Sequence, residues 1–265
     1  MTAESPVLVE LRAGYRVITL NRPDKLNAFN DAMHHALREA IADAEADESC
    51  RALLLTGVGR GFCTGQDLGD RLAKSGESVV LGGAQEAYYN PLVRKLRSLP
   101  FPVVAAVNGV AAGAGANVAL ACDIVLAARS ANFIQSFARV GLVPDSGGTW
   151  FLPRLVGTAR ANGLALLAEP LSAEKAEQWG LIWKCVDDAA LASEAQKLCE
   201  HFASAPTQGL TLIKRALSAS AGNSLDAQLD LERDLQKAAS LTPDYAEGVR
   251  AFIEKRKAIF TGRRP

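Results

Sequence analysis

The sequence predicts an α/β protein in which a mainly parallel sheet comes first and a helical region follows. Short apolar segments alternate with amphipathic ones over residues 7–107, a pattern typical of strands alternating with helices. From residue 147 onward almost every segment has helical periodicity. A chain of 265 residues with 49% apolar content can bury one large core, or a core plus a smaller appendage.

The first half begins with two predicted strands, residues 7–10 and 15–20, joined by a hairpin turn at 12–14. Asn30 is expected to cap an amphipathic helix, because apolar residues then recur at helical spacing. Those apolar residues are Met33, Ala36, Leu37 and Ile41. The remaining elements of this half are a strand at 52–56, a helix at 86–98 and a strand at 102–107.

The second half is predicted to be helical apart from a short strand at 181–186. Its last three helices each carry apolar side chains on one face, so they either cap their own core or pack on neighbouring subunits. We therefore expect a core at 1–203 and a helical region at 204–265. The predicted helices are 147–156, 158–167, 173–179 ending at Gly180, 206–219, 224–241 and 245–257.

Charge and cysteine content exclude several classes of protein. The chain has 29 basic and 29 acidic residues, so nothing in its charge indicates nucleic acid or an anionic membrane as a partner. Five cysteines without C-x-x-C spacing support neither a disulfide framework nor a metal site. The first residues lack the basic and apolar regions of a secretory signal, and the expected location is the cytoplasm.

An uncharged run at residues 98–122 is long enough to span a bilayer. It contains two prolines, two asparagines and three glycines, which argue against a membrane helix. A buried strand, a turn and a buried helix explain the run better.

Two segments are suited to catalysis by backbone N–H groups. Residues 108–117 (NGVAAGAGAN) lie where a strand turns into a helix, and 61–68 (GFCTGQDL) follow the strand at 52–56. Neither the dinucleotide nor the Walker motif is present. Each junction can offer one N–H group, and two donors aimed at one oxygen form an oxyanion hole, each worth about 3 kcal/mol. The alternative is that small residues only let a helix pack closely on a sheet.

Five motifs follow one another in the order of the enoyl-CoA hydratase/isomerase (crotonase) superfamily, and the resemblance covers nearly the whole chain. It implies a spiral of ββα units with a C-terminal helical oligomerisation region that builds trimers or dimers of trimers. Details at 62–68, 90–94 and 143–150 most resemble isomerases of ring-1,2-epoxyphenylacetyl-CoA in phenylacetate degradation. The five motifs are residues 21–29 (NRPDKLNAF), 61–68, 108–117, 122–124 (CDI) and 141–149 (GLVPDSGGT).

The resemblance also implies catalytic roles. Asp145 matches the acid/base carboxylate of the isomerases, although an aspartate before a helix can be an ordinary N-cap. The N–H groups of Gln66 and Ala114 match the two oxyanion donors. Hydratases carry glutamates where this chain has Asn117 and Phe137. Adding water to a double bond usually takes two carboxylates, so hydration is disfavoured and isomerisation is expected.

Coenzyme A, as part of the substrate, is the only cofactor-like group that the resemblance implies, and no metal is expected. Its pantetheine and phosphate would contact the segment at 25–28, and its adenine the segment at 66–68. Two residues of the C-terminal helix, Phe252 and Lys255, would reach the coenzyme A of a neighbouring subunit. Any one lysine can instead lie on a solvated face. The residues implied in the first two segments are Lys25, Leu26, Ala28, Gln66, Asp67 and Leu68.

The sequence thus predicts an isomerase of ring-1,2-epoxyphenylacetyl-CoA that forms the oxepin, with a single aspartate as acid and base. A Δ3,Δ2-enoyl-CoA isomerase would need the same groups and stays an alternative. A protein that only binds acyl-CoA or RNA is the alternative outside the enzymes. His34 and His35 are adjacent on a helix and face different directions, so they cannot form one site.

Overall fold

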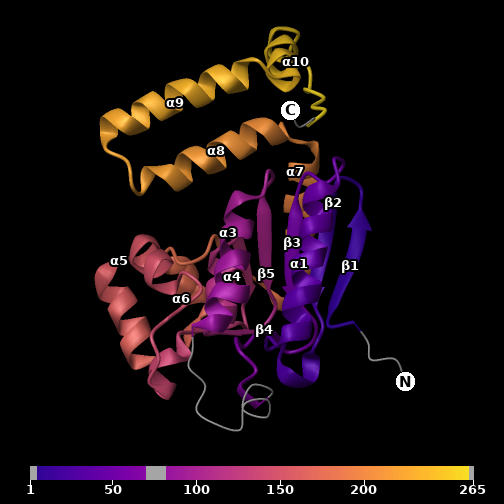
Figure 1. The fold of residues 1–265 in the computed structure, drawn as a ribbon. Coiled ribbons are helices and arrows are strands. Elements are labelled where there is room, and N and C mark those ends of the chain that lie inside the picture. The colour runs from indigo at the N-terminus through magenta and orange to yellow at the C-terminus, as the bar shows by residue number, and fades with distance from the viewer. Residues whose placement is uncertain (1–4, 70–81, 263–265) are drawn as a thin grey trace.

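The computed structural model describes residues 5–69 and 82–262, and in these it contains two sheets connected by helices (Figure 1). The large sheet has the strand order β1-β2-β3-β5-β7-β10, and the small sheet has the order β4-β6-β8-β9. All neighbours in the large sheet are parallel except the hairpin β1–β2, as predicted. The strands are β1 (Val7–Arg12), β2 (Tyr15–Leu20), β3 (Leu53–Gly57), β4 (Gly61–Cys63), β5 (Val103–Val107), β6 (Val110–Ala112), β7 (Ile124–Ala128), β8 (Asn132–Ile134), β9 (Leu171–Ser172) and β10 (Lys184–Val186).

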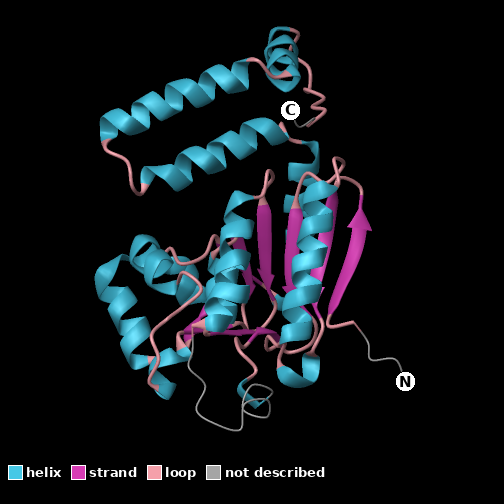
Figure 2. Cartoon of the chain, in the orientation of Figure 1, coloured by secondary structure: helices cyan, strands magenta, loops and turns pink. Residues whose placement is uncertain are grey.

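The chain alternates between the two sheets as it advances. After β3, β5 and β7 in the large sheet it passes to β4, β6 and β8 in the small one, and helices follow before the next pass. In Figure 2 the small sheet lies across one end of the large one. The expected spiral of ββα units is therefore confirmed.

Most predicted helices are present with shifted ends. The side chain of Asn30 accepts a hydrogen bond from the backbone N–H of Met33 and so caps α1, as predicted. The helices predicted at 147–156 and 158–167 form the single element α5, which is interrupted at Gly157 (φ 76°, ψ 161°). The helices are α1 (Asp31–Ala46), α3 (Asn90–Ser98), α4 (Ala114–Leu120), α5 (Gly148–Leu167), α6 (Ala173–Gln178), α7 (Leu191–Ser204), α8 (Thr207–Ser220), α9 (Leu225–Ser240) and α10 (Pro243–Ile253).

Two local expectations differ from the structure. The helix predicted at 86–98 begins as a π-helical turn, η2 (Gln85–Tyr89), before it continues as α3. The glycine-rich segment contains the short strand β6, and its helix begins at Ala114 rather than near Val118. The uncharged run at 98–122 forms β5, β6 and α4, and no helix within 5–69 and 82–262 is long and apolar enough to cross a membrane.

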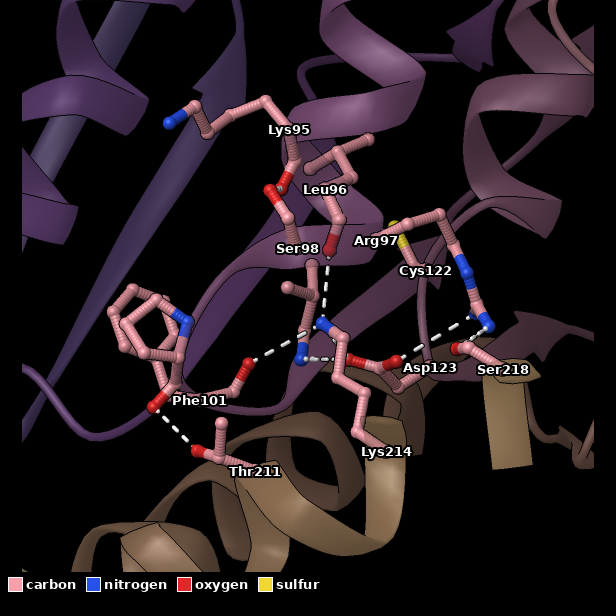
Figure 3. A network of polar contacts seen from close by, with 12 residues as sticks. Lys95, Leu96, Arg97, Ser98, Phe101, Cys122, Asp123, Thr211, Lys214 and Ser218 are labelled. Carbon is pink, nitrogen blue, oxygen red and sulfur yellow. Dashed lines mark hydrogen bonds and ion pairs between the residues drawn. The ribbon is translucent and has the colours of Figure 1, made fainter. Parts of the chain in front are cut away.

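Helices α8, α9 and α10 lie together beyond one end of the large sheet (Figure 1). Lys214 of α8 reaches into the core, where its Nζ lies 2.7 Å from Oδ2 of Asp123 and 2.8 Å from the carbonyl oxygen of Leu96 (Figure 3). Arg97 of α3 donates to Ser218 of the same helix. We call Arg97, Asp123 and Lys214 the latch, because these three residues join α8 to the core. A domain boundary at residue 203 stays a prediction.

Candidate active site

A cavity of about 280 Å³ lies at the carboxyl ends of β4, β6 and β8. These strands are neighbours and run parallel, so the loops that follow them meet at one edge of the small sheet. The structure brings together here the three residues to which the sequence assigned catalytic roles, Gln66, Ala114 and Asp145. The lining comprises Thr64, Gly65, Gln66, Leu68, Gln85, Tyr89, Gly113, Ala114, Ser136, Phe137, Arg139, Val140, Leu142 and Asp145.

The backbone around Gln66 forms an isolated parallel bridge with Phe29. The N–H of Phe29 donates to the carbonyl of Gly65 at 2.7 Å, and the N–H of Asp67 donates to the carbonyl of Phe29 at 2.8 Å. Because the two residues that flank Gln66 make these bonds, the N–H of Gln66 points to the opposite side of the segment. It is therefore available as a donor.

Ala114 offers the second N–H group. It is the first residue of α4, so its N–H has no acceptor within the helix. The preceding residue, Gly113, has φ 51° and ψ −127°, a conformation that favours glycine. This sharp turn begins the helix directly at the cavity, where the N-terminal end of a helix favours negative charge.

Two glycines bring the donor segments into contact. A Cβ atom on Gly65 would lie 3.2 Å from the nitrogen of Ala114 and 3.1 Å from the carbonyl oxygen of Ala112. A Cβ atom on Gly115 would lie 2.2 Å from the carbonyl oxygen of Cys63. The small residues thus permit close packing, as the alternative interpretation required, and that packing also places the two donors together.

Asp145 enters the same cavity from the loop before α5. Its Oδ1 accepts a hydrogen bond from Oγ of Ser146 at 2.9 Å, and its Oδ2 accepts one from Nε2 of Gln85 at 3.0 Å. The N-cap of α5 is Gly147, and no side chain caps this helix. The interpretation of Asp145 as an ordinary N-cap is therefore wrong, and its carboxylate is held instead by two neutral donors.

The loop that carries Asp145 has an unusual backbone. Ser146 has φ 51° and Gly147 has φ 83°, so two successive residues are left-handed, and for a serine this conformation is strained. The carbonyl of Asp145 accepts a 2.8 Å hydrogen bond from Nδ2 of Asn117, and Oδ1 of Asn117 accepts one from Gln135 at 2.9 Å. The buried amide of Asn117 thus fixes the loop from behind.

The side chain of Gln66 is not a free surface group. Its Nε2 donates to the carbonyl of Phe29 at 3.1 Å, and its Oε1 accepts from the hydroxyl of Tyr89 at 3.0 Å. Its amide is used to fix the segment whose N–H faces the cavity.

A family model described as enoyl-CoA hydratase/isomerase matches residues 10–263. The chain belongs to this family. A 1,2-epoxyphenylacetyl-CoA isomerase of Escherichia coli K12 is 56% identical over 97% of this chain and 98% of its own. A probable enoyl-CoA hydratase of Rhodobacter capsulatus is 49% identical over 96% and 97%. A trans-2-decenoyl-[acyl-carrier-protein] isomerase of Streptococcus mutans is 34% identical over 97% and 98%.

Solved structures of the enoyl-CoA hydratase/isomerase family show the same fold. One from Mycobacterium abscessus, described as a putative enoyl-CoA hydratase/isomerase, superimposes with a TM-score of 0.91 at 33% identity, covering 97% of this chain and all of the other. A putative enoyl-CoA hydratase from Streptomyces coelicolor gives 0.90 at 36% identity, covering 99% and 97%. The family and fold expected from the five motifs are therefore confirmed.

Asn117 and Phe137, the two positions at which the hydratase pattern has glutamate, are both buried here. Asn117 is fully buried and is occupied by its hydrogen bonds to the backbone of Asp145 and to Gln135. Phe137 is buried and its ring forms part of the cavity wall. Of the described residues that line the cavity, Asp145 is the only carboxylate.

The segments expected to contact coenzyme A lie side by side. The N–H of Thr64 donates to the carbonyl of Leu26 at 3.1 Å, and Arg22 bridges them by bonding the carbonyl of Ala28 and forming a 2.9 Å ion pair with Asp67. Asp67 is thus held in a buried ion pair, whereas Leu68 is half exposed and lines the cavity.

Three residues predicted to contact coenzyme A, Lys25, Phe252 and Lys255, do not line the cavity of their own chain. Lys25 is exposed at the end of η1 (Pro23–Lys25). Phe252, with 85% of its surface exposed, and Lys255 lie at the end of α10, in the C-terminal region beyond the far end of the large sheet (Figure 1). A contact from a neighbouring subunit stays a prediction.

Gln85 and Tyr89 are the site residues that the sequence did not reveal. Tyr89 lies within the helix predicted at 86–98 and Gln85 lies just before it, 60 residues before its partner Asp145. Helical periodicity shows which residues share a face and says nothing of which distant loop that face meets. Without the fold, neither side chain could be assigned to the site.

Proposed function

We propose that this protein is an isomerase of acyl-CoA thioesters that converts ring-1,2-epoxyphenylacetyl-CoA to its oxepin form. One observation carries the proposal. Of the described cavity residues, Asp145 alone is a carboxylate, and it shares the cavity with two backbone donors. The relative that is 56% identical over nearly the whole chain bears the name of this activity, which supports the choice of substrate.

The geometry suits proton transfer next to a polarised carbonyl. The N–H groups of Gln66 and Ala114 would bind the thioester oxygen and stabilise the negative charge that develops there. Asp145 would take a proton from the carbon beside the thioester and return it to a ring carbon, while the carbon–carbon bond of the epoxide breaks and both of its carbon–oxygen bonds remain. The same proton leaves and comes back, so the isomerisation needs neither water nor a second carboxylate.

A Δ3,Δ2-enoyl-CoA isomerase is the second candidate, because moving a double bond requires the same donors and the same single carboxylate. The cavity wall is apolar around Leu68, Phe137 and Leu142, which suits an aromatic ring and an alkyl chain alike. Hydration is disfavoured because the second glutamate of the hydratases is replaced by Phe137.

We propose further that the protein acts in the cytoplasm as a trimer or a dimer of trimers. Large apolar side chains lie exposed on α9 and α10, as expected of surfaces that a neighbouring subunit covers. Phe252 and Lys255 would then reach the coenzyme A bound by that neighbour. The most exposed of these side chains are Leu225, Leu229, Tyr245, Phe252 and Ile253.

The replacement Asp145→Asn tests the catalytic role. It keeps the shape of the side chain and removes its ability to accept a proton. We expect turnover of both the epoxide and a β,γ-unsaturated acyl-CoA to fall about 1,000-fold. The affinity for coenzyme A, measured by calorimetry, should stay the same.

Asp43→Asn is the matched control, because Asp43 is exposed on α1. If Asp145→Asn turns over either substrate as fast as this control, the acid/base assignment is wrong. If the unaltered protein turns over neither substrate but binds coenzyme A, it is a binding protein. A band shift with RNA at physiological salt would identify the RNA-binding alternative.

A further inference from the structure

Gln85 has a position that no motif assigned. It is the first residue of the π-helical turn η2 and lines the cavity opposite Asp145, to which it donates through Nε2 at 3.0 Å. Short π-helical segments occur frequently at functional sites, because they turn side chains in directions that a regular helix does not allow. Here the same turn carries Tyr89, whose hydroxyl bonds the amide of Gln66.

The amide oxygen of Gln85 is the end of the side chain that does not bind Asp145. Its Oε1 is buried, and no donor among the described residues lies within hydrogen-bond distance of it. A buried polar atom without a partner is costly and rare, and in native proteins it calls for an explanation. The explanation must show why Nε2 of this amide has a hydrogen-bond partner among the described residues and Oε1 has none.

An amide can match a carboxyl group in both of its protonation states. A carboxylate only accepts hydrogen bonds, so it needs the NH₂ group, whereas a protonated carboxyl group offers a donor and needs the carbonyl oxygen. If the amide of Gln85 turns over when Asp145 takes up a proton, Oε1 gains a partner and Nε2 loses one. One amide atom is unpaired in both states, so the exchange requires no additional hydrogen bond.

We propose that Gln85 is a positioning residue that holds the carboxyl group of Asp145 toward the cavity in both its ionised and its protonated form. The inference rests on the acid/base role proposed for Asp145. A fixed cation in place of Gln85 would bind the carboxylate more tightly and oppose its protonation. The neutral amide keeps the side chain in place while the proton arrives and leaves.

Two replacements of Gln85 test this role. Gln85→Met keeps the size of the side chain and removes both hydrogen-bonding ends, and we expect kcat to fall about 10-fold to 100-fold with little change in KM. Gln85→Glu keeps the shape but faces Asp145 with a second carboxyl group. Because two close carboxyl groups do not both ionise readily, the acid limb of kcat/KM should move up by about one pH unit or more.

The other ionisable side chains that line the described part of the cavity, Arg139 and Tyr89, stay unchanged in both variants. Glu86→Met is the matched control, because Glu86 is the exposed neighbour of Gln85 on the same turn. Its kcat and pH profile should equal those of the unaltered protein. Thermal unfolding of all three variants shows whether the turn remains folded.

The proposal is overturned if both Gln85 variants keep the kcat and the pH profile of the Glu86→Met control. It is also overturned if a folded Gln85→Met changes KM alone, since that result would indicate a contact with substrate. If the proposed function itself is wrong, Asp145→Asn retains activity, and this result distinguishes the two failures.

Discussion

Two carboxylates of this protein, Asp123 and Asp145, have contrasting surroundings. Asp123 belongs to the latch, where its Oδ2 accepts from Nζ of Lys214 at 2.7 Å and from the N–H of Val103 at 2.8 Å, and its Oδ1 lies 3.7 Å from Arg97 (Figure 3). Among the described residues, the carboxylate of Asp145 accepts hydrogen bonds from the hydroxyl of Ser146 and the amide of Gln85, and it faces a cavity.

The difference suggests that Asp123 contributes to stability and Asp145 to catalysis, and that the two roles belong to separate parts of the fold. The carboxylate of Asp123 pairs with two cations and joins α8 to the core, so removing it would leave positive charges without this partner. The carboxylate of Asp145 joins no distant elements by ion pairs, and its position at the cavity leaves it within reach of a substrate. Their different roles come from their neighbours in space.

After the loss expected of Asp145→Asn, the next largest effect on turnover is expected at the oxyanion donor Ala114. Ala114→Pro removes one N–H from the cavity, and proline is well tolerated at the first position of a helix. We expect kcat to fall about 100-fold to 1,000-fold while the circular dichroism spectrum is retained. The control is Asp31→Pro, which places proline at the first position of α1, after the extended Asn30. If Ala114→Pro keeps the kcat of this control, the assignment of the donor fails.

Breaking the latch should affect stability alone. Burial lowers the pKa of Lys214, and the attraction of Asp123 opposes this shift. The ammonium group of Lys214 is thus partly removed from water. Lys214→Met would leave Asp123 with fewer partners, and we expect the free energy of unfolding to fall by about 3 kcal/mol. Urea denaturation measures this change. A loss of kcat in the folded variant, with stability unchanged, would contradict the separation of the two roles.

A smaller effect is expected from His34, which stacks between Phe29 and Tyr88 behind the π-helical turn. Burial lowers its pKa from 6.5 to about 4, so the folded protein keeps it neutral while the unfolded chain binds a proton below pH 6.5. The free energy of unfolding should therefore fall as the pH drops from 6.5 to 4. The contribution of His34 to this loss is at most about 3 kcal/mol.

His34→Phe preserves the stacked ring and removes the titration. Denaturation curves at pH 7 and pH 4.5 should show a smaller difference for this variant than for the unaltered protein. His35→Phe, at the exposed neighbouring position, is the control. Equal differences in all three proteins would show that His34 is not held neutral.

Much of the local structure could be predicted because it depends on neighbours in the sequence. The cap by Asn30 and the break at Gly180, where φ is 78°, depend on residues within one helical turn. The meeting of Gln66, Ala114 and Asp145 was also expected, although only through the resemblance to a family. The periodicity itself places none of the three next to another.

The rest of the site depends on contacts that no local pattern records. The sequence identified Asn117 as a position that differs from the hydratase pattern. Its hydrogen bond to the backbone carbonyl of Asp145, however, joins residues that lie 28 positions apart. The π-helical turn differs from a regular helix only in which carbonyl group each N–H bonds, and no residue type in the sequence marks this difference. The amides of Gln66 and Gln85 therefore resemble ordinary polar side chains until the chain is folded.

The contact between Gly115 and the carbonyl of Cys63 has a consequence for changing the specificity of the protein. Main-chain atoms set the closest distance between the donor segments, so keeping it requires glycine at Gly65 and Gly115 and no side chain of the apolar wall. The residues that form the apolar wall, such as Phe137 and Leu142, come from a different stretch of chain. An engineer can therefore enlarge or reshape the acyl pocket at these positions while the carbonyl-binding geometry stays as it is.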